Sequence, residues 1–200
     1  FTVLMYAANN GDIEMAKLLL TAGVDVNQVG LDGTHTLPYA IARGQDKFAL
    51  FLLEHGADPN GAMEGIRALH AAAGNTRMWL DDWSRRHGHG GSYLRGGFRT
   101  NNLTPSRRLP LIRALLNAGA DPNARIETSA MFMNYIGYPT KGAFEPFACG
   151  TGDLHGATPL WVAAYTANGG TYRASPGNPE GYAEILQTLL DAGADLHLTT

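Results

Sequence analysis

The chain has 200 residues, of which 44% are hydrophobic, and its formal net charge is −3 at pH 7. This composition supports a buried core, and the small negative charge argues against a general affinity for nucleic acid or anionic membranes. The single cysteine, Cys149, excludes an internal disulfide framework, and no apolar run in the sequence is long enough to span a bilayer.

A 33-residue period runs through the start of the chain. Five residues recur at this spacing, with Leu4, Gly11, Gly23, Asp25 and Asn27 returning as Leu37, Gly44, Gly56, Asp58 and Asn60. Self-similarity at a period of this length indicates a stack of small structural units that share one continuous core. Such stacks usually present an extended surface to another macromolecule.

The first unit is predicted to contain two short helices and a tight turn. Thr2 can cap a helix over residues 4–8, because its hydroxyl accepts a hydrogen bond from a free amide at the helix start. Apolar residues at helical spacing predict a second helix over residues 13–21. Gly23 can then adopt the left-handed conformation that ends a helix, and Asp32–Gly33 is typical of a tight turn.

Later segments repeat the end of this unit. The leucine pair Leu19–Leu20 recurs as Leu52–Leu53, Leu115–Leu116 and Leu189–Leu190. The Gly-Ala-Asp sequence that follows occurs at Gly56, Gly119 and Gly193, and Thr158–Pro159–Leu160 supplies an opening with proline at the first helical position. These residues resemble the ankyrin repeat. The resemblance implies an all-α solenoid of helix-turn-helix units with short β-hairpin fingers.

Alignment to this motif predicts a single domain over residues 1–200 with three long insertions. The predicted repeats span about 1–33, 34–65, 66–123 and 156–200. The predicted insertions span about 75–106, 124–155 and 165–180, all at loop positions where added length costs little entropy. His35 and Arg67 replace the capping threonine in the second and third repeats, so the helices that follow are expected to lack a hydroxyl cap.

No complete catalytic or metal-binding pattern is present in the sequence. His87 and His89 have no second pair of ligands at metal-binding spacing, and Cys149 and His155 have no third group to orient them as a nucleophile pair. His70 occupies the position of a histidine that the resemblance implies to be structural. We therefore expect no enzymatic activity, no cofactor and no bound metal.

The first insertion combines arginine with aromatic residues. Residues 75–108 hold seven arginines and two aspartates, a net charge of +5 that leaves −8 for the remainder. The candidate contacts here are Trp79, Trp83, Arg85, Arg86 and Arg95. Three interpretations remain open: the tryptophans, four residues apart, fold back as a local cap; the insertion contacts a protein of acidic surface; or it contacts nucleic acid or lipid, which the acidic remainder disfavours.

The remaining candidate contacts follow from the second insertion and from the resemblance. The second insertion is aromatic without being basic, and its Tyr135 and Tyr138 either pack on neighbouring repeats or contact a partner. The resemblance implies recognition through finger tips and the exposed side of the first helices. By motif position these residues are Asn9, Asn10, Leu31, Asp32, Arg43, Met63, Glu64, His155 and Tyr165.

The function that the resemblance implies is non-catalytic protein recognition, as an interaction module or as a scaffold subunit. Two alternatives are a binding module attached to an enzymatic or membrane domain outside this segment, and nucleic-acid contact through the first insertion. The chain opens at Phe1–Thr2 in mid-motif, which suggests a segment of a longer array and leaves the cellular compartment open. No membrane span is expected within the segment.

Overall fold

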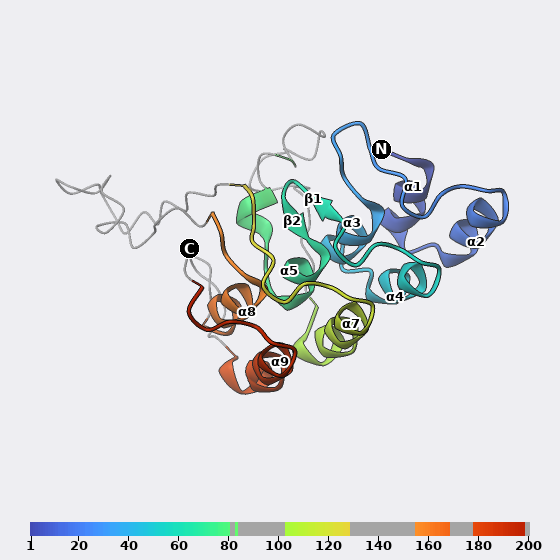
Figure 1. The fold of residues 1–200 in the computed structure, drawn as a ribbon. Coiled ribbons are helices and arrows are strands. Elements are labelled where there is room, and N and C mark those ends of the chain that lie inside the picture. The colour runs from blue at the N-terminus through green and yellow to red at the C-terminus, as the bar shows by residue number, and fades with distance from the viewer. Residues whose placement is uncertain (81–82, 84–102, 129–154, 169–177, 199–200) are drawn as a thin grey trace, which may run out of the picture.

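A computed structural model describes residues 1–80, 83, 103–128, 155–168 and 178–198 (Figure 1). Within these residues the secondary structure is mostly helical and forms four helix pairs. The first helices of the pairs are α1 (Val3–Asn10), α3 (Thr36–Ala42), α5 (Ala68–Ala73) and α8 (Pro159–Ala167). The second helices are α2 (Ile13–Thr21), α4 (Asp46–Glu54), α7 (Pro105–Asn117) and α9 (Pro179–Asp191).

The helix pairs stack side by side. Each first helix packs on the first helix of the next repeat and on the second helix of its own repeat, or, for α5, on α7 across the first insertion. In Figure 1 the stack runs from the first repeat at the right to the fourth at the left. This arrangement confirms the expected all-α repeat solenoid.

The helix starts agree with the capping residues predicted from the sequence. Met5 N donates to Thr2 Oγ1 at 3.3 Å, and Trp161 N donates to Thr158 Oγ1 at 3.3 Å. The starts of α3 and α5 have no side-chain cap from His35 or Arg67. His35 instead binds the second finger, where Ala62 N donates to its Nδ1 at 3.3 Å. The residue that replaces the capping threonine in the second repeat therefore links two segments of the chain.

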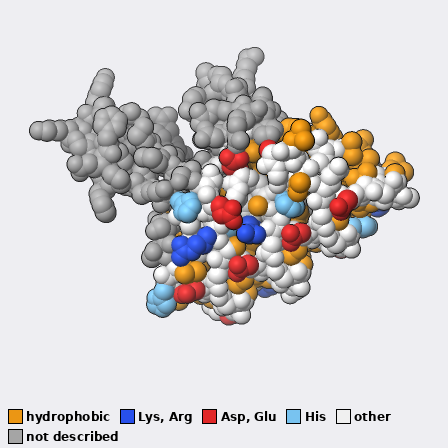
Figure 2. Space-filling model, turned by 45° about the horizontal axis from the view of Figure 1, so that its top comes forward, with side chains coloured by type: hydrophobic (Ala, Val, Ile, Leu, Met, Phe, Trp, Pro, Cys, Tyr) orange, Lys and Arg blue, Asp and Glu red, His pale blue; other side chains and the backbone are white. Residues whose placement is uncertain are grey.

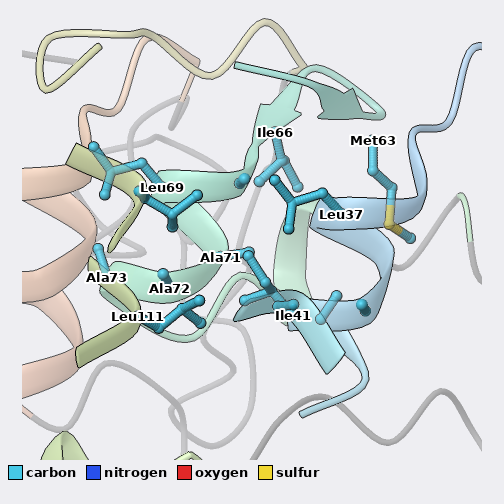
Figure 3. Packing of buried hydrophobic residues seen from close by; sticks show 14 of the residues in the cluster. Leu37, Ile41, Met63, Ile66, Leu69, Ala71, Ala72, Ala73 and Leu111 are labelled. Atoms are coloured by element: carbon cyan, nitrogen blue, oxygen red, sulfur yellow. The ribbon is translucent and has the colours of Figure 1, made fainter. Parts of the chain in front are cut away.

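Small residues let the first helices approach closely. Figure 3 shows Ala71 of α5 towards Ile41 of α3, and Ala72 and Ala73 near Leu111 of α7. All five of these side chains are buried. The leucine positions predicted for the core are also fully buried in the later repeats, at Leu52, Leu115 and Leu189. A larger side chain in place of the alanines would force neighbouring helices apart.

One finger of the stack is a regular β-hairpin. Strand β1 (Ala62–Met63) pairs antiparallel with β2 (Ile66–Arg67), with Met63 opposite Ile66. The two-residue turn has positive φ at both Glu64 (52°) and Gly65 (72°). This combination matches the twist of the flanking strands, and it places the tip of the finger at Glu64 and Gly65.

An asparagine ladder joins each repeat to the next at the base of the fingers. Asn60 Nδ2 donates to Gly119 O at 2.9 Å, and Asp121 N donates to Asn60 Oδ1 at 2.9 Å. Asn27 makes the same pair of bonds to Gly56 and Asp58, and Asn123 makes it to Gly193 and Asp195. A primary amide can do this because its acceptor and donor lie side by side. The ladder therefore fixes the register between successive repeats.

Two arginines at the end of the first insertion bind other parts of the fold. Arg107 pairs with Asp46 at the start of α4, with Nε donating to Oδ2 at 3.0 Å, and this pair lowers the pKa of Asp46. Arg108 is buried, and its guanidinium donates to Leu103 O at 2.9 Å and to Ala72 O at 2.8 Å. It also donates to the carbonyls of Ala71 and Gly74, so it satisfies the C-terminal carbonyls of α5.

Candidate partner-binding surface

The tip of the first finger presents an apolar residue on a well-ordered turn. Leu31 is fully exposed, and Val29 beside it is partly exposed. Gly33 N donates to Gly30 O at 2.9 Å to close the turn, and Asp32 accepts bonds from Thr34 N at 3.1 Å and Thr34 Oγ1 at 2.8 Å. These bonds hold the backbone of the turn, and none of them involves the side chain of Leu31.

Asp32 is bound from a second direction by Trp83. The indole Nε1 donates to Asp32 Oδ2 at 2.9 Å and to Thr34 Oγ1 at 3.1 Å. Partial burial alone would raise the pKa of Asp32, but the hydrogen bonds from Thr34 and Trp83 outweigh it and lower that pKa below its ordinary value. Asp32 is therefore an ionised group that organises the finger, with one carboxylate oxygen shared by Thr34 and Trp83.

The second and third fingers contact each other through their backbones. Glu127 N donates to Gly65 O at 3.1 Å, and Arg67 Nη2 lies 3.3 Å from Glu127 Oε1. A Cβ at Gly65 would lie 2.9 Å from Glu127 Cβ, which is too close. The close approach of the two fingers therefore requires glycine at this position. Glu64 therefore stands at the tip of this hairpin, half-buried beside the third finger.

His155 lies at the far side of the third finger. The His155 side chain is exposed. The two residues that follow it bind the start of the same finger, where Gly156 N donates to Ile126 O at 2.8 Å and Ile126 N donates to Ala157 O at 3.0 Å. Leu31, Asp32, Glu64 and His155 thus lie on the finger side of the stack, as expected from the motif positions. Figure 2 views the molecule with this side turned forward.

The expected contacts on the first helices are partly engaged within the chain. Asn9 Oδ1 accepts from Tyr39 Oη at 3.1 Å, and Asn9 O accepts from Gln45 Nε2 at 3.3 Å, so Asn9 joins the first two repeats. Asn10 is exposed and bonded to Asn9. Arg43 is half-buried at the end of α3. Asn9 and Arg43 therefore offer less exposed surface than Leu31, whereas Asn10 remains exposed.

Tyr165 lies near the end of α8, in the fourth repeat, and belongs to an aromatic cluster there. Its ring stacks on Trp161 with centroids 5.0 Å apart and an interplanar angle of 14°. Trp161 in turn meets Trp79 edge-to-face at 6.3 Å. Tyr165 remains half exposed, and burial raises the pKa of its hydroxyl. Its phenol is therefore neutral at physiological pH.

Three residues proposed as contacts are buried and do not belong to an exposed surface. Met63 is a strand residue with its side chain in the core, because the finger tip lies one residue further along. Trp79 and Trp83 are also buried, so the local-packing interpretation applies to these two side chains. Their spacing suggested a shared helix face, but Trp79 packs on Trp161 whereas Trp83 packs on Tyr39 and Phe1, at 5.9 and 6.0 Å.

Five other candidate contacts lie outside the described residues: Arg85, Arg86, Arg95, Tyr135 and Tyr138. Of the seven arginines counted in residues 75–108, the side chains of Arg107 and Arg108 are described, and both bind groups within the chain. Sequence reasoning also passed over exposed apolar residues of the first repeat, among them Val3, Tyr6, Met15 and Leu18. No signal in the sequence marks them as exposed, because their counterparts 33 residues later, such as Tyr39 and Phe48, are also apolar.

The titratable groups of the described residues support a structural role for His70. Burial lowers the pKa of His70 to about 4. Its Nε2 donates to Ala124 O at 2.9 Å, and its Nδ1 accepts from Arg67 N at 3.2 Å, which is the pattern of a neutral imidazole.

Among the described residues no group of three or more His, Cys, Asp or Glu side chains is placed to hold a metal ion. No helix in the same residues is long and apolar enough to cross a membrane.

Comparison with known families agrees with this geometry. A model described as "Ankyrin repeats (3 copies)" matches residues 4–79, and one described as "Ankyrin repeat" matches residues 155–200. The chain belongs to the ankyrin repeat family. Ankyrin repeats are generally protein-interaction modules, and the finger tips described above are the exposed ends of these repeats.

Three curated relatives show different extents of similarity to this chain. The chain is 36% identical over 85 residues to the E3 ubiquitin-protein ligase KEG of Arabidopsis thaliana, a match that covers 41% of this chain and 5% of the ligase. It is 36% identical over 75 residues to palmitoyltransferase ZDHHC13 of Homo sapiens, covering 36% of this chain and 12% of the transferase. It is 32% identical over 96 residues to cyclin-dependent kinase 4 inhibitor B of Bos taurus, covering 40% of this chain and 72% of the inhibitor. The ligase and transferase matches thus extend over a small part of those proteins.

Proposed function

We propose that this chain is a non-catalytic protein-recognition module that binds a partner protein through its finger tips, with Leu31 as the principal apolar contact. The family assignment supports a protein partner, because ankyrin repeats generally act in this way. A relative whose name describes a kinase inhibitor is matched over 72% of its length, which is consistent with a binding role.

The observation that carries the proposal is the preorganised turn beneath Leu31. An exposed leucine loses little side-chain freedom on binding when its backbone is already fixed, so its burial contributes to affinity with a small ordering cost. The turn is fixed by the bonds that Thr34 and Trp83 donate to Asp32. Val29 adds apolar area on the same finger. A compact apolar contact surrounded by polar groups is the usual form of a binding hot spot.

The experiment compares two charge substitutions at exposed leucines. Co-purification of the native protein followed by mass spectrometry identifies the partner, and its affinity is then measured for Leu31→Asp and for the matched control Leu196→Asp. Leu196 is 70% exposed and lies beyond α9, away from the first finger. We expect Leu31→Asp to weaken binding by about tenfold or more and Leu196→Asp to leave it unchanged. Equal affinities for the two variants contradict the proposal.

A second candidate is a recognition module attached to an enzymatic domain outside these residues. The partial matches to a ligase and a palmitoyltransferase favour it, since in both relatives the similarity covers only a small part of the protein. In that case the finger tips select the substrate protein for the attached activity. Deleting residues 1–200 from the full-length protein would abolish activity on the partner while activity on a small model substrate persists. If the protein is instead a permanent scaffold subunit, neither the full-length protein nor the protein lacking residues 1–200 would show enzymatic activity.

A further inference from the structure

The segment that follows α5 is anchored where it leaves the third repeat. Gly74 O accepts from Arg108 Nη1 at 3.1 Å, and Asn75 N donates to Thr166 Oγ1 of α8 at 2.9 Å. A Cβ at Gly74 would lie 2.7 Å from Val162 O, so the backbone passes directly against α8. The start of the segment is therefore fixed to the first helix of the fourth repeat.

Two tryptophans of the same segment contact different parts of the stack. Trp79 meets Trp161 of α8 edge-to-face at 6.3 Å, and Trp83 meets Tyr39 of α3 at 5.9 Å. Trp83 also donates to Asp32 Oδ2 of the first finger at 2.9 Å. Both tryptophans are almost fully buried, at 2% and 1% exposure. The described residues from 75 to 83, which are 75–80 and 83, are called the brace.

The brace joins repeats that are not neighbours. By sequence it belongs to the third repeat, yet it binds the first repeat at Asp32, the second at Tyr39 and the fourth at Trp161. In a simple repeat stack each repeat contacts only its neighbours, so distant repeats influence each other only through the repeats between them. Trp79 and Trp83 are four residues apart, so the chain keeps their Cα atoms within about 14 Å. The brace is therefore a direct connection between the first finger and α8.

The brace is packed tightly enough to transmit a change from one end to the other. Its short 3-10 helix η1 (Arg77–Leu80) begins after Thr76, and Trp79 N donates to Thr76 O at 3.2 Å. Thr76 and Leu80 are buried together with the two tryptophans. Because protein interiors are close-packed, the loss of one large side chain shifts the groups that pack around it. We therefore expect truncation of Trp79 to be felt at Trp83.

We propose that the brace couples the first finger to the fourth repeat, and that Trp79 is a positioning residue for the turn that carries Leu31. This turn is held by the bonds that Thr34 N and Trp83 Nε1 donate to Asp32. Truncation of Trp79 loosens Trp83 and so weakens the support of the turn. Coupling is reciprocal, so a partner bound at the first finger also tightens the contact of the brace with α8. The effect on binding rests on the proposed function, whereas the coupling within the chain does not.

The first test measures the coupling without a partner, by native-state hydrogen exchange. The reporter is the amide of Thr34, which donates to Asp32 in the first finger, and the reference is the amide of Asp121, which donates to Asn60 in the ladder. We expect Trp79→Ala to accelerate exchange at Thr34 at least about fivefold more than at Asp121, because the opening is local to the finger. If exchange at Thr34 rises no more than exchange at Asp121, the inference is overturned.

Two further variants separate the coupling from a general loss of stability. Leu115→Ala truncates a fully buried side chain of α7, so it should not accelerate exchange at Thr34 more than at Asp121. Thr166→Val keeps nearly the same shape but removes the hydroxyl that accepts from Asn75 N, so it should favour exchange at Thr34, by a smaller factor than Trp79→Ala. Thr166→Val decides the question if Trp79→Ala does not fold. A preferential rise at Thr34 in Leu115→Ala, or none in Thr166→Val, overturns the inference.

The second test measures the effect on binding, with the partner identified by co-purification. We expect Trp79→Ala to bind it at least about threefold more weakly than Leu115→Ala does, and the bound partner to slow exchange at the amide of Asn75. If Leu31→Asp leaves the affinity unchanged, the proposed function fails while the exchange result at Thr34 still supports the brace. If Leu31→Asp weakens binding but Trp79→Ala binds as well as Leu115→Ala, the brace has no part in recognition and the inference is overturned.

Discussion

The indole N–H of Trp83 donates to Asp32 Oδ2 at 2.9 Å, across 51 residues of sequence. One residue belongs to the insertion within the third repeat, and the other to the finger of the first. The bond means that the insertion contributes to the conformation of a finger two repeats away. Substitutions of Trp83 therefore test whether the insertion and the first finger are energetically coupled.

We expect Trp83→Phe to lower the free energy of unfolding by about 1 kcal/mol, because it removes one hydrogen-bond donor while keeping an aromatic ring against Tyr39. Trp83→Ala should cost about 3–5 kcal/mol, since it also empties a fully buried site. Urea unfolding measures both. A smaller loss for Trp83→Ala than for Trp83→Phe would contradict the packing described. The pKa of Asp32, followed by NMR, should rise in both variants because the bond from Trp83 lowers it.

Leu52→Ala and Leu115→Ala should each destabilise the stack by about 2–5 kcal/mol, the range for truncating a buried leucine. Both side chains are fully buried in equivalent positions of α4 and α7. Leu18→Ala is the matched control, because this leucine of α2 is mostly exposed in residues 1–200. Thermal unfolding provides the comparison. An unchanged midpoint for both buried variants would show that the repeat alignment is wrong.

Asn60→Ala should loosen the junction between the second and third repeats. It removes the bonds to Gly119 O and Asp121 N, and the site is partly exposed, so we expect a loss of about 1–2 kcal/mol. Hydrogen exchange at the amide of Asp121 should accelerate, while exchange at Asp58, which binds Asn27, should stay unchanged. Equal acceleration at both amides would indicate global destabilisation instead of a local break in the ladder.

Stability should fall as the pH is lowered from about 6.5 to about 4 because of His70. The pKa of this side chain is about 4 in the folded protein and about 6.5 when unfolded, so only the unfolded state takes up a proton in this window. The stabilising difference is complete above pH 6.5, falls by up to about 3 kcal/mol across the window and levels off below pH 4. Urea unfolding at several pH values measures it. His70→Gln should flatten this part of the profile, and an unchanged slope would contradict the assignment.

The basic first insertion should make partner binding sensitive to salt if it contacts an acidic protein surface. The test replaces only residues 84–102 with a Gly/Ser loop, because Trp79, Trp83 and Leu103 are buried and a longer replacement would remove core residues. We expect the trimmed chain to bind its partner more weakly, with a shallower dependence on ionic strength. Retention of single-stranded RNA by the intact chain alone would favour nucleic acid instead. Identical affinity and salt dependence would leave the insertion without a role in binding.

The helix pairs could be predicted from the sequence because the 33-residue period specifies both the helices and the turns between them. The period also gave the finger side of the stack, but it could not place Met63, whose side chain turns inward because the hairpin turn occupies Glu64 and Gly65. His35 shows a similar limit. It lacks the hydroxyl of a cap, yet its ring binds Ala62 in the second finger, so His35→Thr would gain a cap and lose that contact.

The charge of the first insertion could be counted from the sequence, but its distribution could not. Arg107 is neutralised by Asp46, 61 residues away in the sequence, and Arg108 is buried against backbone carbonyls. Such tertiary pairings leave no local signal in the sequence. The same holds for Trp79 and Trp83, whose spacing of four residues indicates a common face only if they lie on one regular helix.

The position of Arg108 has a consequence for how the insertion can change. Its guanidinium binds Ala72 O and Gly74 O, which lead into the insertion, and Leu103 O, which leads out of it. A single side chain therefore binds the chain on both sides of the insertion, at its base. A segment of different length and sequence can replace the insertion while the repeats on either side keep their spacing, so this junction is suited to loop grafting.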